Sequence, residues 1–423
     1  MLTGLIVDLF AGGGGASTGL AMALGRSPDI AIDRDDAALS LHRVNHPGTR
    51  HILGDVRAIS PREATQGLPV AILHASPECT HFSRAKGQGP RSRSSRSLAW
   101  QVVRWAAKTR PLLITVENVE EFETWGPLDA CGRPLRGRMG EYFREWVWRL
   151  NRLGYRVDWQ VLRACDYGVP TSRRRLFIVA RRDGAPIVWP GVTHGNPEAA
   201  MPEDLPPWPS ARDCVDWTLP GKSLFGRKKP LAANTLRRVA EGFRRHVLMN
   251  GMSGENACIV ILRGTSTSSA IDTPVHTISA QGQHHAVAFA CLVKYYGNER
   301  GGVSLSAPMH TVTCKDRMGL AYALVSGRDR SSEVREFLRK HRAIGKGEDA
   351  AVMVGGTLHR IADIRLRMLT PRELFRAQGF PESYVIYRDT DGRPVPKTTQ
   401  VRVCGNAVPP GLLAALVRAN RPE

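Results

Sequence analysis

The chain has 423 residues, which is enough for two or three domains with a sizeable buried core. Its 59 lysines and arginines exceed its 39 aspartates and glutamates by 20, and so large a positive surplus favours a nucleic acid partner. Its eight cysteines include no C-x-x-C pair, which argues against a zinc site or a disulfide framework, and its longest apolar runs are far too short to span a membrane.

Residues 1–185 alternate between apolar runs of strand length and helical stretches. The candidate strands are four runs at residues 4–10, 70–74, 112–116 and 176–180. This alternation predicts an α/β fold with a doubly wound, mostly parallel sheet, whose functional residues gather at the carboxyl ends of the strands. Because the first run follows Met1 almost at once, there is no room for a signal peptide, and we expect a cytoplasmic protein.

The first candidate strand runs into a glycine loop, Asp8-Leu9-Phe10-Ala11-Gly12-Gly13-Gly14-Gly15. Such glycines permit a tight turn and the close approach of a nucleotide to the backbone. The loop does not match the G-x-G-x-x-G pattern, because Ser17 or Thr18 stands where the pattern requires its third glycine. A nicotinamide or flavin cofactor is therefore disfavoured. Asp33 is placed to accept hydrogen bonds from ribose hydroxyls, and Asp55 from an adenine amino group. An adenosyl cofactor without a pyrophosphate fits best.

The second candidate strand leads into Ala75-Ser76-Pro77-Glu78-Cys79-Thr80-His81-Phe82-Ser83. A cysteine here and a glycine loop after the first strand suggest a nucleophile and a cofactor site on one sheet. Residues 80–116 hold eight arginines or lysines and no acid, and 83–97 are rich in glycine and serine. We expect this loop to close over a nucleic acid. Its candidate contacts to the nucleic acid are Ser83, Arg84, Lys86, Arg91, Arg93 and Arg96.

The sequence changes character after residue 185. Residues 186–220 are crowded with proline and tryptophan, which is typical of an irregular linker or surface loop. Thr273-Pro274-Val275-His276-Thr277-Ile278 recurs 34 residues later as Ala307-Pro308-Met309-His310-Thr311-Val312, and each copy leads into an apolar strand, at 286–293 and 320–325. This weak repeat predicts a smaller, β-rich domain.

A third pattern begins near residue 363. Thr370 before Pro371 is typical of a helix start, and a last helix is expected over 411–420. We therefore predict three segments: a catalytic domain over 1–185, an inserted β-rich domain over 186–362, and a segment over 363–423 that completes the catalytic domain.

Six blocks in this order resemble the DNA cytosine-5 methyltransferases, in particular the bacterial and phage enzymes. They are Asp8-Leu9-Phe10-x-Gly12, Pro77-x-Cys79-x-x-Phe82-Ser83, Glu117-Asn118-Val119, Gly168-Val169-Pro170-x-x-Arg173-x-Arg175, Leu369-Thr370-Pro371-Arg372-Glu373 with Gln378-Gly379-Phe380-Pro381, and Gly405-Asn406-Ala407-Val408. The resemblance covers the α/β part almost throughout. It implies a Rossmann-like catalytic domain interrupted by a target-recognition domain.

The resemblance also implies roles for individual residues. Cys79 would add to carbon 6 of a flipped-out cytosine, which makes carbon 5 nucleophilic enough to take a methyl group. Glu117 would contact ring nitrogen 3 and the exocyclic amine, and Arg173 and Arg175, two apart on a strand, would bind the carbonyl oxygen. The cofactor would be S-adenosylmethionine, with S-adenosylhomocysteine as product. Its expected binding residues are Phe10, Gly12, Gly13, Gly15, Asp33, Asp55, Asn406 and Ala407.

The chain departs from the family pattern beside its nucleophile. Glu78 and Thr80 stand where the family usually has proline and glutamine, and Thr171 replaces a glutamine before the two arginines. An unpaired acid next to Cys79 would raise the pKa of the thiol, unless a neighbouring cation neutralises it. Arg34 stands where the family has an aromatic residue against adenine.

Alternatives remain at this point. An RNA cytosine-5 methyltransferase of similar fold and a catalytically silent DNA-binding protein are both compatible with the charge. An amino methyltransferase would need an aromatic residue in place of Cys79. For the leading reading we expect double-stranded DNA as substrate, a monomer without metal, a possible companion restriction endonuclease, and association with the nucleoid. The candidate base contacts in the inserted domain are Gln281, Lys315 and Arg317.

Overall fold

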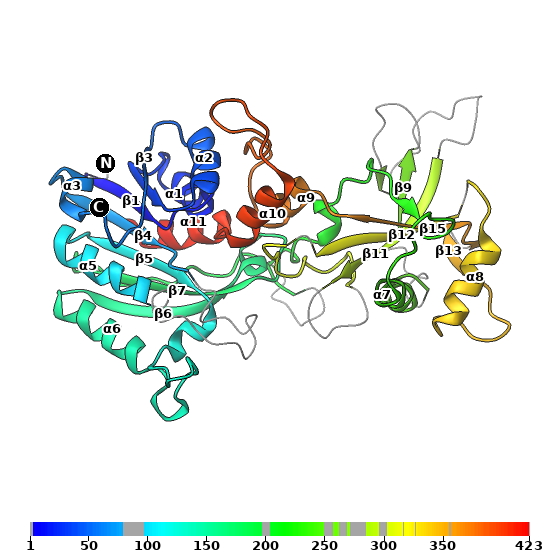
Figure 1. Cartoon of the computed structure of the whole chain (residues 1–423), viewed down its shortest axis with the longest axis horizontal. Helices are drawn as coiled ribbons and strands as arrows, with labels where there is room; N and C mark the ends of the chain where they lie inside the picture. Colours follow the sequence, from blue (N-terminus) through cyan, green and yellow to red (C-terminus); the bar gives the residue numbers. More distant parts are fainter. Residues whose placement is uncertain are drawn as a thin grey trace. The chain divides into compact units, whose positions relative to one another are not determined.

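A computed structural model of the chain describes residues 3–78, 97–196, 204–248, 257–261, 269–270, 285–295, 303–315, 317–325, 327–354 and 357–422. The chain folds into two compact units (Figure 1). The first unit consists of Met1–Trp208, His310–Cys314 and Phe375–Glu423, and the second of Pro209–Met309 and Lys315–Leu374.

The first unit is built on a seven-stranded sheet in the order β3-β2-β1-β4-β5-β7-β6. Its strands are β1 (Leu5–Leu9), β2 (Ile30–Asp33), β3 (Arg50–Leu53), β4 (Val70–Ala75), β5 (Leu113–Asn118), β6 (Arg156–Arg163) and β7 (Arg174–Arg181). The five strands from β3 to β5 are parallel, and β7 is antiparallel to both of its neighbours. The predicted doubly wound, mostly parallel sheet is thereby confirmed.

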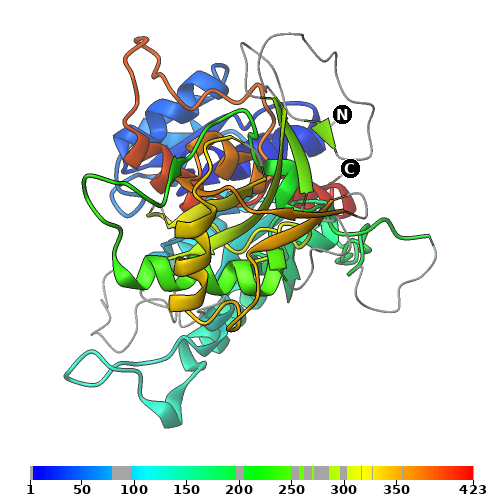
Figure 2. The same cartoon turned by 90° about the vertical axis from the view of Figure 1, so that its right-hand side faces the viewer.

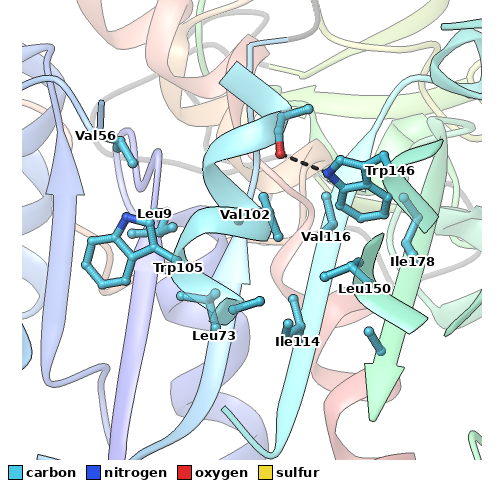
Figure 3. Close-up of a cluster of buried hydrophobic side chains, with 14 of the residues drawn as sticks. Leu9, Val56, Leu73, Val102, Trp105, Ile114, Val116, Trp146, Leu150 and Ile178 are labelled. Carbon is cyan, nitrogen blue, oxygen red and sulfur yellow. Dashed lines mark hydrogen bonds between the residues drawn. The ribbon is translucent and has the colours of Figure 1, made fainter. Parts of the chain in front are cut away.

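Helices cover both faces of this sheet (Figure 1). They are α1 (Gly15–Leu24), α2 (Asp36–Asn45), α3 (Pro61–Thr65), α5 (Trp100–Thr109), α6 (Glu141–Arg152), α10 (Lys397–Asn406) and α11 (Pro410–Ala419). On one face, Trp105 of α5 and Trp146 of α6 are fully buried over β1, β4, β5 and β7, and Trp146 Nε1 donates to Ala99 O at 2.9 Å (Figure 3). Burial of large aromatic side chains is a major source of stability in such a core.

On the other face, α1 and α11 form a second core with alternate residues of the same strands. Glycines permit their close approach. A Cβ at Gly15 would lie 2.5 Å from Val408 O, and one at Gly19 would lie 2.7 Å from Pro410 O. The C-terminal segment thus completes the first unit, and the predicted last helix is present as α11.

The second unit contains a six-stranded antiparallel sheet in the order β10-β9-β11-β12-β15-β8. Its strands are β8 (Lys222–Ser223), β9 (Ala257–Ile261), β10 (Ser269–Ala270), β11 (His285–Lys294), β12 (Met318–Leu324) and β15 (Asp363–Met368), and a hairpin pairs β13 (Ala351–Val354) with β14 (Thr357–Arg360). Helices α7 (Ala233–Phe243) and α8 (Ser331–Lys340) pack on its apolar core. The two predicted strands after the repeat are β11 and β12.

The limits of the units differ from the segments inferred from sequence. Trp208 Nε1 donates to Asp166 at 2.9 Å, which ties the proline-rich stretch to the first unit. Residues 363–368, by contrast, form β15, which pairs with β12 in the second unit. Helix α9 (Pro371–Ala377) begins in the second unit and ends in the first. Which unit recognises the target remains a prediction. Among the described residues no helix is long and apolar enough to cross a membrane.

Candidate active site

The two predicted functional loops leave the sheet side by side. The strand order reverses between β1 and β4, and in open α/β sheets ligands bind outside the carboxyl ends of strands at such a switch point. The glycine loop follows β1, and the loop of Cys79 follows β4. The backbone N–H of Ser76 donates to Leu9 O at 3.2 Å, so the two strand ends are joined.

The glycine loop contains a small open cradle. Phe10 and Gly12 have positive φ values of 60° and 52°, which turn the chain sharply after β1. A Cβ added at Gly12 would meet nothing within 4 Å, whereas one at Gly13 would lie 2.0 Å from Val403 Cγ1. Gly12 therefore leaves room for a ligand to approach the backbone, while Gly13 serves the packing of α10.

Asp33 closes one side of the cradle. Its Oδ2 accepts from Gly12 N and its Oδ1 from Asp35 N, both at 2.8 Å. Burial raises the pKa of this carboxyl. Each carboxylate oxygen has a second lone pair, so Asp33 can still accept from a ribose hydroxyl. Asp55 instead pairs with Arg57, at 2.5 Å from Nη2, and this hydrogen bond lowers its pKa.

A chain of buried polar groups lies beneath the loop, and the sequence analysis did not find it. Ser17 Oγ donates to Asp8 Oδ2 at 2.7 Å, His42 Nε2 lies 2.8 Å from Ser17 Oγ, and His42 Nδ1 lies 2.8 Å from His51 Nε2. Burial raises the pKa of Asp8 to about 7 and lowers those of His46 and His51 to about 4. Histidines at positions 42, 46 and 51 of one short stretch were the available signal.

The residues ahead of Cys79 are held firmly. His74 is fully buried, and its ring nitrogens lie 2.9 Å from Thr115 Oγ1 and 2.8 Å from Ser76 Oγ. Asn118 Nδ2 donates to Pro77 O at 3.1 Å. The chain is therefore fixed to β5 two residues before the cysteine. Cys79 itself lies outside the described residues, as do Ser83, Arg84, Lys86, Arg91, Arg93, Arg96 and Gln281.

Glu78, the acid beside the nucleophile, has a cationic partner. Arg34 Nη2 lies 3.1 Å from Glu78 Oε2, and the two side chains are 62% and 30% exposed. Arg34 follows β2 and Glu78 follows β4, so the contact joins the predicted cofactor side to the predicted nucleophile side. Both residues differ from those that the family usually has at these positions, and the two unusual residues contact each other.

Glu117 is buried at the carboxyl end of β5, 7% exposed, and pairs with Arg175 at 3.1 Å between Oε1 and Nε. Arg173 lies just before β7, because that strand begins at Arg174. Its guanidinium is buried and donates to Gly405 O at 3.0 Å. The structure thus brings Arg175 to Glu117, while Arg173 holds the backbone of α10. The expectation that both arginines lie on one strand is wrong for Arg173.

A five-residue segment, His310–Cys314, belongs to the first unit although its neighbours in sequence belong to the second. It packs on Gly405, where an added Cβ would lie 2.4 Å from Cys314 N. Cys314 Sγ donates to Asn406 Oδ1. Asn406 is exposed and Ala407 is buried against α1. No sequence signal had separated this segment from the repeat around it. Lys315 is exposed and Arg317 is half-buried, and both precede β12, which begins at Met318.

Comparison with known proteins identifies the family. The model of the C-5 cytosine-specific DNA methylases matches residues 5–420. The type II methyltransferase M.AquIA of Picosynechococcus sp. is 30% identical over 225 residues, which cover 51% of this chain and 88% of the relative. The type II methyltransferase M1.HphI of Haemophilus parahaemolyticus is 24% identical over 423 residues, which cover 98% of this chain and 85% of the relative.

A solved structure shares the fold. A mutant of Spodoptera frugiperda DNMT2 superposes with a TM-score of 0.52 at 16% identity, over 98% of each chain. The family match extends over nearly the whole chain, and the chain therefore belongs to the C-5 cytosine-specific DNA methylases, as an S-adenosylmethionine-dependent DNA cytosine-5 methyltransferase.

Proposed function

We propose that Cys79, Glu117 and Arg175 carry out the methylation of cytosine. The observation that carries this proposal is the junction between β4 and β5. Asn118, the neighbour of Glu117, fixes Pro77 two residues ahead of Cys79, and Arg175 reaches the Glu117 carboxyl from β7. The backbone two residues ahead of Cys79 and the buried carboxyl of Glu117 are thereby held at one edge of the sheet, beside the glycine cradle.

Each group has a defined task in this proposal. The Cys79 thiolate forms a bond to carbon 6 of the flipped base, and the ring electrons move to carbon 5. Glu117, with its proton shared with ring nitrogen 3, supports the charge that develops there. Arg175 orients the Glu117 carboxyl and would bind the base carbonyl. After methyl transfer, loss of the proton from carbon 5 re-forms the double bond and expels Cys79 as thiolate.

The cradle fits an adenosyl cofactor. Gly12 leaves space at the backbone, and Asp33 presents a half-buried carboxylate beside it. S-adenosylmethionine supplies the electrophilic methyl group when bound. In this proposal Phe10, Gly12 and Asp33 hold the adenosyl part. Gly13 and Gly15 act by letting α10 and the segment after it pack against the loop. Asp55 must leave Arg57, or share it, to receive an adenine amino group.

The second unit is the proposed target-recognition domain, with Lys315 and Arg317 among the contacts to base edges. We further propose that the enzyme acts as a cytoplasmic monomer on a specific duplex sequence in the nucleoid. The relatives named above are type II methyltransferases, which is the ground for proposing a companion restriction endonuclease.

The test is nucleoside mass spectrometry of unmethylated DNA after incubation with the protein and labelled S-adenosylmethionine. We expect label in 5-methylcytosine, none above background for Cys79→Ala, and a loss of about 10²- to 10⁴-fold in rate for Glu117→Gln. The matched control is Glu120→Gln, since Glu120 pairs with Arg174 at 3.0 Å on the exposed surface, three residues along the chain.

Label that persists in Cys79→Ala would disprove the thiolate mechanism. Equal losses in the Glu117 and Glu120 variants would show that removal of any carboxyl in this region is harmful, and the role of Glu117 would fall.

A further inference from the structure

The first unit contains the same β-hairpin twice. Residues 127–135 read Pro-Leu-Asp-Ala-Cys-Gly-Arg-Pro-Leu and residues 387–395 read Tyr-Arg-Asp-Thr-Asp-Gly-Arg-Pro-Val, so both contain D-x-x-G-R-P. Leu128 bridges Pro134 in one, and Arg388 bridges Pro394 in the other. We refer to residues 127–135 as hairpin A and to residues 387–395 as hairpin B.

The two hairpins have the same hydrogen bonds. In hairpin A, Asp129 N donates to Arg133 O at 2.8 Å, and Arg133 N donates to Asp129 Oδ1 at 2.8 Å. In hairpin B, Asp389 N donates to Arg393 O at 3.0 Å, and Arg393 N donates to Asp389 Oδ1 at 2.8 Å. The two turn glycines, at 132 and 392, have φ values of 75° and 76°.

The hairpin needs three of the four residue types that its two copies share for its own structure. The aspartate accepts hydrogen bonds from the turn, and the glycine supplies the positive φ. The proline lies at a position where no N–H is needed, because the next residue, Leu135 or Val395, donates across the hairpin to Pro127 O or Tyr387 O. The arginine contributes only its backbone. Among the described residues, Arg133 has no side-chain partner. Arg393 lies 3.0 Å from Asp391, but the two are 75% and 59% exposed, so this pair is weak.

Each hairpin is anchored to one part of the active site. Hairpin A follows β5, the strand that carries Glu117, by way of the buried Trp125. Hairpin B follows Tyr384 and Val385. The hydroxyl of Tyr384 donates to the carbonyl of Gly13 in the cofactor loop, and Asn45 of α2 exchanges two hydrogen bonds with the backbone of Val385.

The hairpins project from opposite sides of the first unit. In both views hairpin A is the teal loop at the bottom, beyond α6, and hairpin B is the orange loop at the top (Figures 1 and 2). Their tips are exposed and add nothing to the core. The two hairpins thus carry one exposed arginine each, on opposite sides of the first unit. A guanidinium matches the geometry of phosphate oxygens.

From this arrangement we propose that Arg133 and Arg393 bind phosphates of the substrate duplex on the two sides of the target cytosine. The inference rests on DNA as the substrate. Phosphate contacts position a duplex without reading its sequence. Substitution of either arginine therefore weakens binding of every target to the same extent, and the sequence that the enzyme methylates does not change.

The experiment measures DNA affinity by fluorescence anisotropy over a range of salt concentrations. The probe is a duplex with a methylated site, identified by bisulfite sequencing, centred between long flanks. Arg133→Ala and Arg393→Ala are each expected to reduce the slope of log affinity against log salt by about 1, and the double variant by about 2. Lysine at either position should restore most of the slope.

Arg156→Ala is the matched control. Arg156 is exposed and is paired with Arg181, which is in turn paired with Leu113 at the start of β5. Arg156 therefore lies at the end of the sheet opposite to the carboxyl end of β5, where Glu117 is found. Trimming one flank of the duplex should remove the effect of Arg133→Ala, and trimming the other flank should remove that of Arg393→Ala.

Slopes for the two hairpin variants that equal the slope for Arg156→Ala would overturn the proposal, and so would effects that persist on both trimmed duplexes. Methylation of the trimmed duplexes by the wild-type enzyme tests the proposed function separately, since it requires no contact with the flanks.

Discussion

The two units bury different kinds of groups. Near the C-terminal ends of its parallel strands, the first unit buries several polar side chains: the carboxyls of Asp8 and Glu117, the guanidinium of Arg173, and the rings of His42 and His74. In the described part of the second unit, the only buried polar or charged residues are Ser331, Asp363 and Glu373. Buried polar groups cost stability unless they are hydrogen-bonded, so a fold that concentrates them at one edge reserves that edge for chemistry.

The two sheets differ in a related way. A parallel sheet brings strand ends that are far apart in sequence to one edge, which is how the loops after β1 and β4 come together. The antiparallel sheet of the second unit is continuous through β9, β11, β12 and β15. If the second unit chooses the target, as proposed, the comparison predicts that reaction and target choice are separable, except at His310–Cys314, the segment of the first unit that interrupts the second.

We expect the largest effect when segments are exchanged with a relative that methylates another sequence, and this exchange tests the separation. Replacing 230–309 and 315–325 while keeping 310–314 should transfer the donor's target preference, a change of at least about 10³-fold between sites, with methyl transfer retained. Replacing 230–325 whole should lower the rate by about 10²-fold, because Arg173 and Gly405 lose the segment they pack against. Sequencing of bisulfite-treated DNA measures both.

If neither hybrid changes the target, the second unit does not choose it. If both hybrids transfer methyl groups at the same rate, the packing of 310–314 has no part in catalysis.

The sequence predicts the first unit well, because its elements carry local signals. The strands at 4–10, 70–74, 112–116 and 176–180 appear as β1, β4, β5 and β7. The apolar runs of buried strands are sufficient for this. Strands β2, β3 and β6 are missed. Strands β3 and β6 lie at the two edges of the sheet with most of their residues exposed or half-exposed, and β2 has only four residues.

What sequence could not predict depends on contacts between distant residues. Nothing local marks Arg34 as the partner of Glu78, or places Arg173 against Gly405. The spacing of two residues suggested a shared face for Arg173 and Arg175, but the strand begins between them. The segment 310–314 was read with its repeat, because membership of a unit is decided by packing.

The three histidines under the cofactor loop give the first unit a pH dependence, and in the second unit partial burial lowers the pKa of His341 in the same direction. Burial lowers the pKa of His42, and lowers those of His46 and His51 to about 4. Since these pKa values lie below those of the unfolded chain, their stabilisation is present above about pH 6.5 and is lost as pH falls toward 4. The contribution of His46 to the free energy of unfolding should fall by on the order of 2 kcal/mol between pH 7 and pH 5. Urea unfolding at the two pH values measures this.

Asp8 acts in the opposite direction, because burial raises its pKa to about 7, so its contribution is lost as pH rises from about 4 to 7. His46→Gln should flatten the acid limb, and Asp8→Asn should steepen the net fall in stability toward acid pH. The control is His359→Gln on β14 in the second unit. A His46→Gln variant that loses stability toward acid as steeply as wild type would refute the assignment.

The smallest expected effect concerns Arg34 and Glu78, the contact that spans the cofactor and nucleophile sides. An exposed ion pair contributes at most about 1 kcal/mol, so Arg34→Gln should slow methylation by no more than about 5-fold. The cause would be electrostatic, because an unpaired Glu78 carboxylate raises the pKa of the neighbouring Cys79 thiol. The rate against pH, measured at saturating cofactor, should then shift to higher pH in Arg34→Gln and to lower pH in Glu78→Gln.

The double variant separates this cause from a loss of cofactor binding. If Arg34 acts by neutralising Glu78, Arg34→Gln has no further effect once Glu78 is already glutamine, and the double variant matches Glu78→Gln in rate and pH profile. If Arg34 instead contacts the adenosyl group, its substitution raises the KM for S-adenosylmethionine equally in both backgrounds and leaves the pH profile in place. The second result would remove the charge coupling between the two sides of the site, and the departures of Arg34 and Glu78 from the family pattern would then need separate explanations.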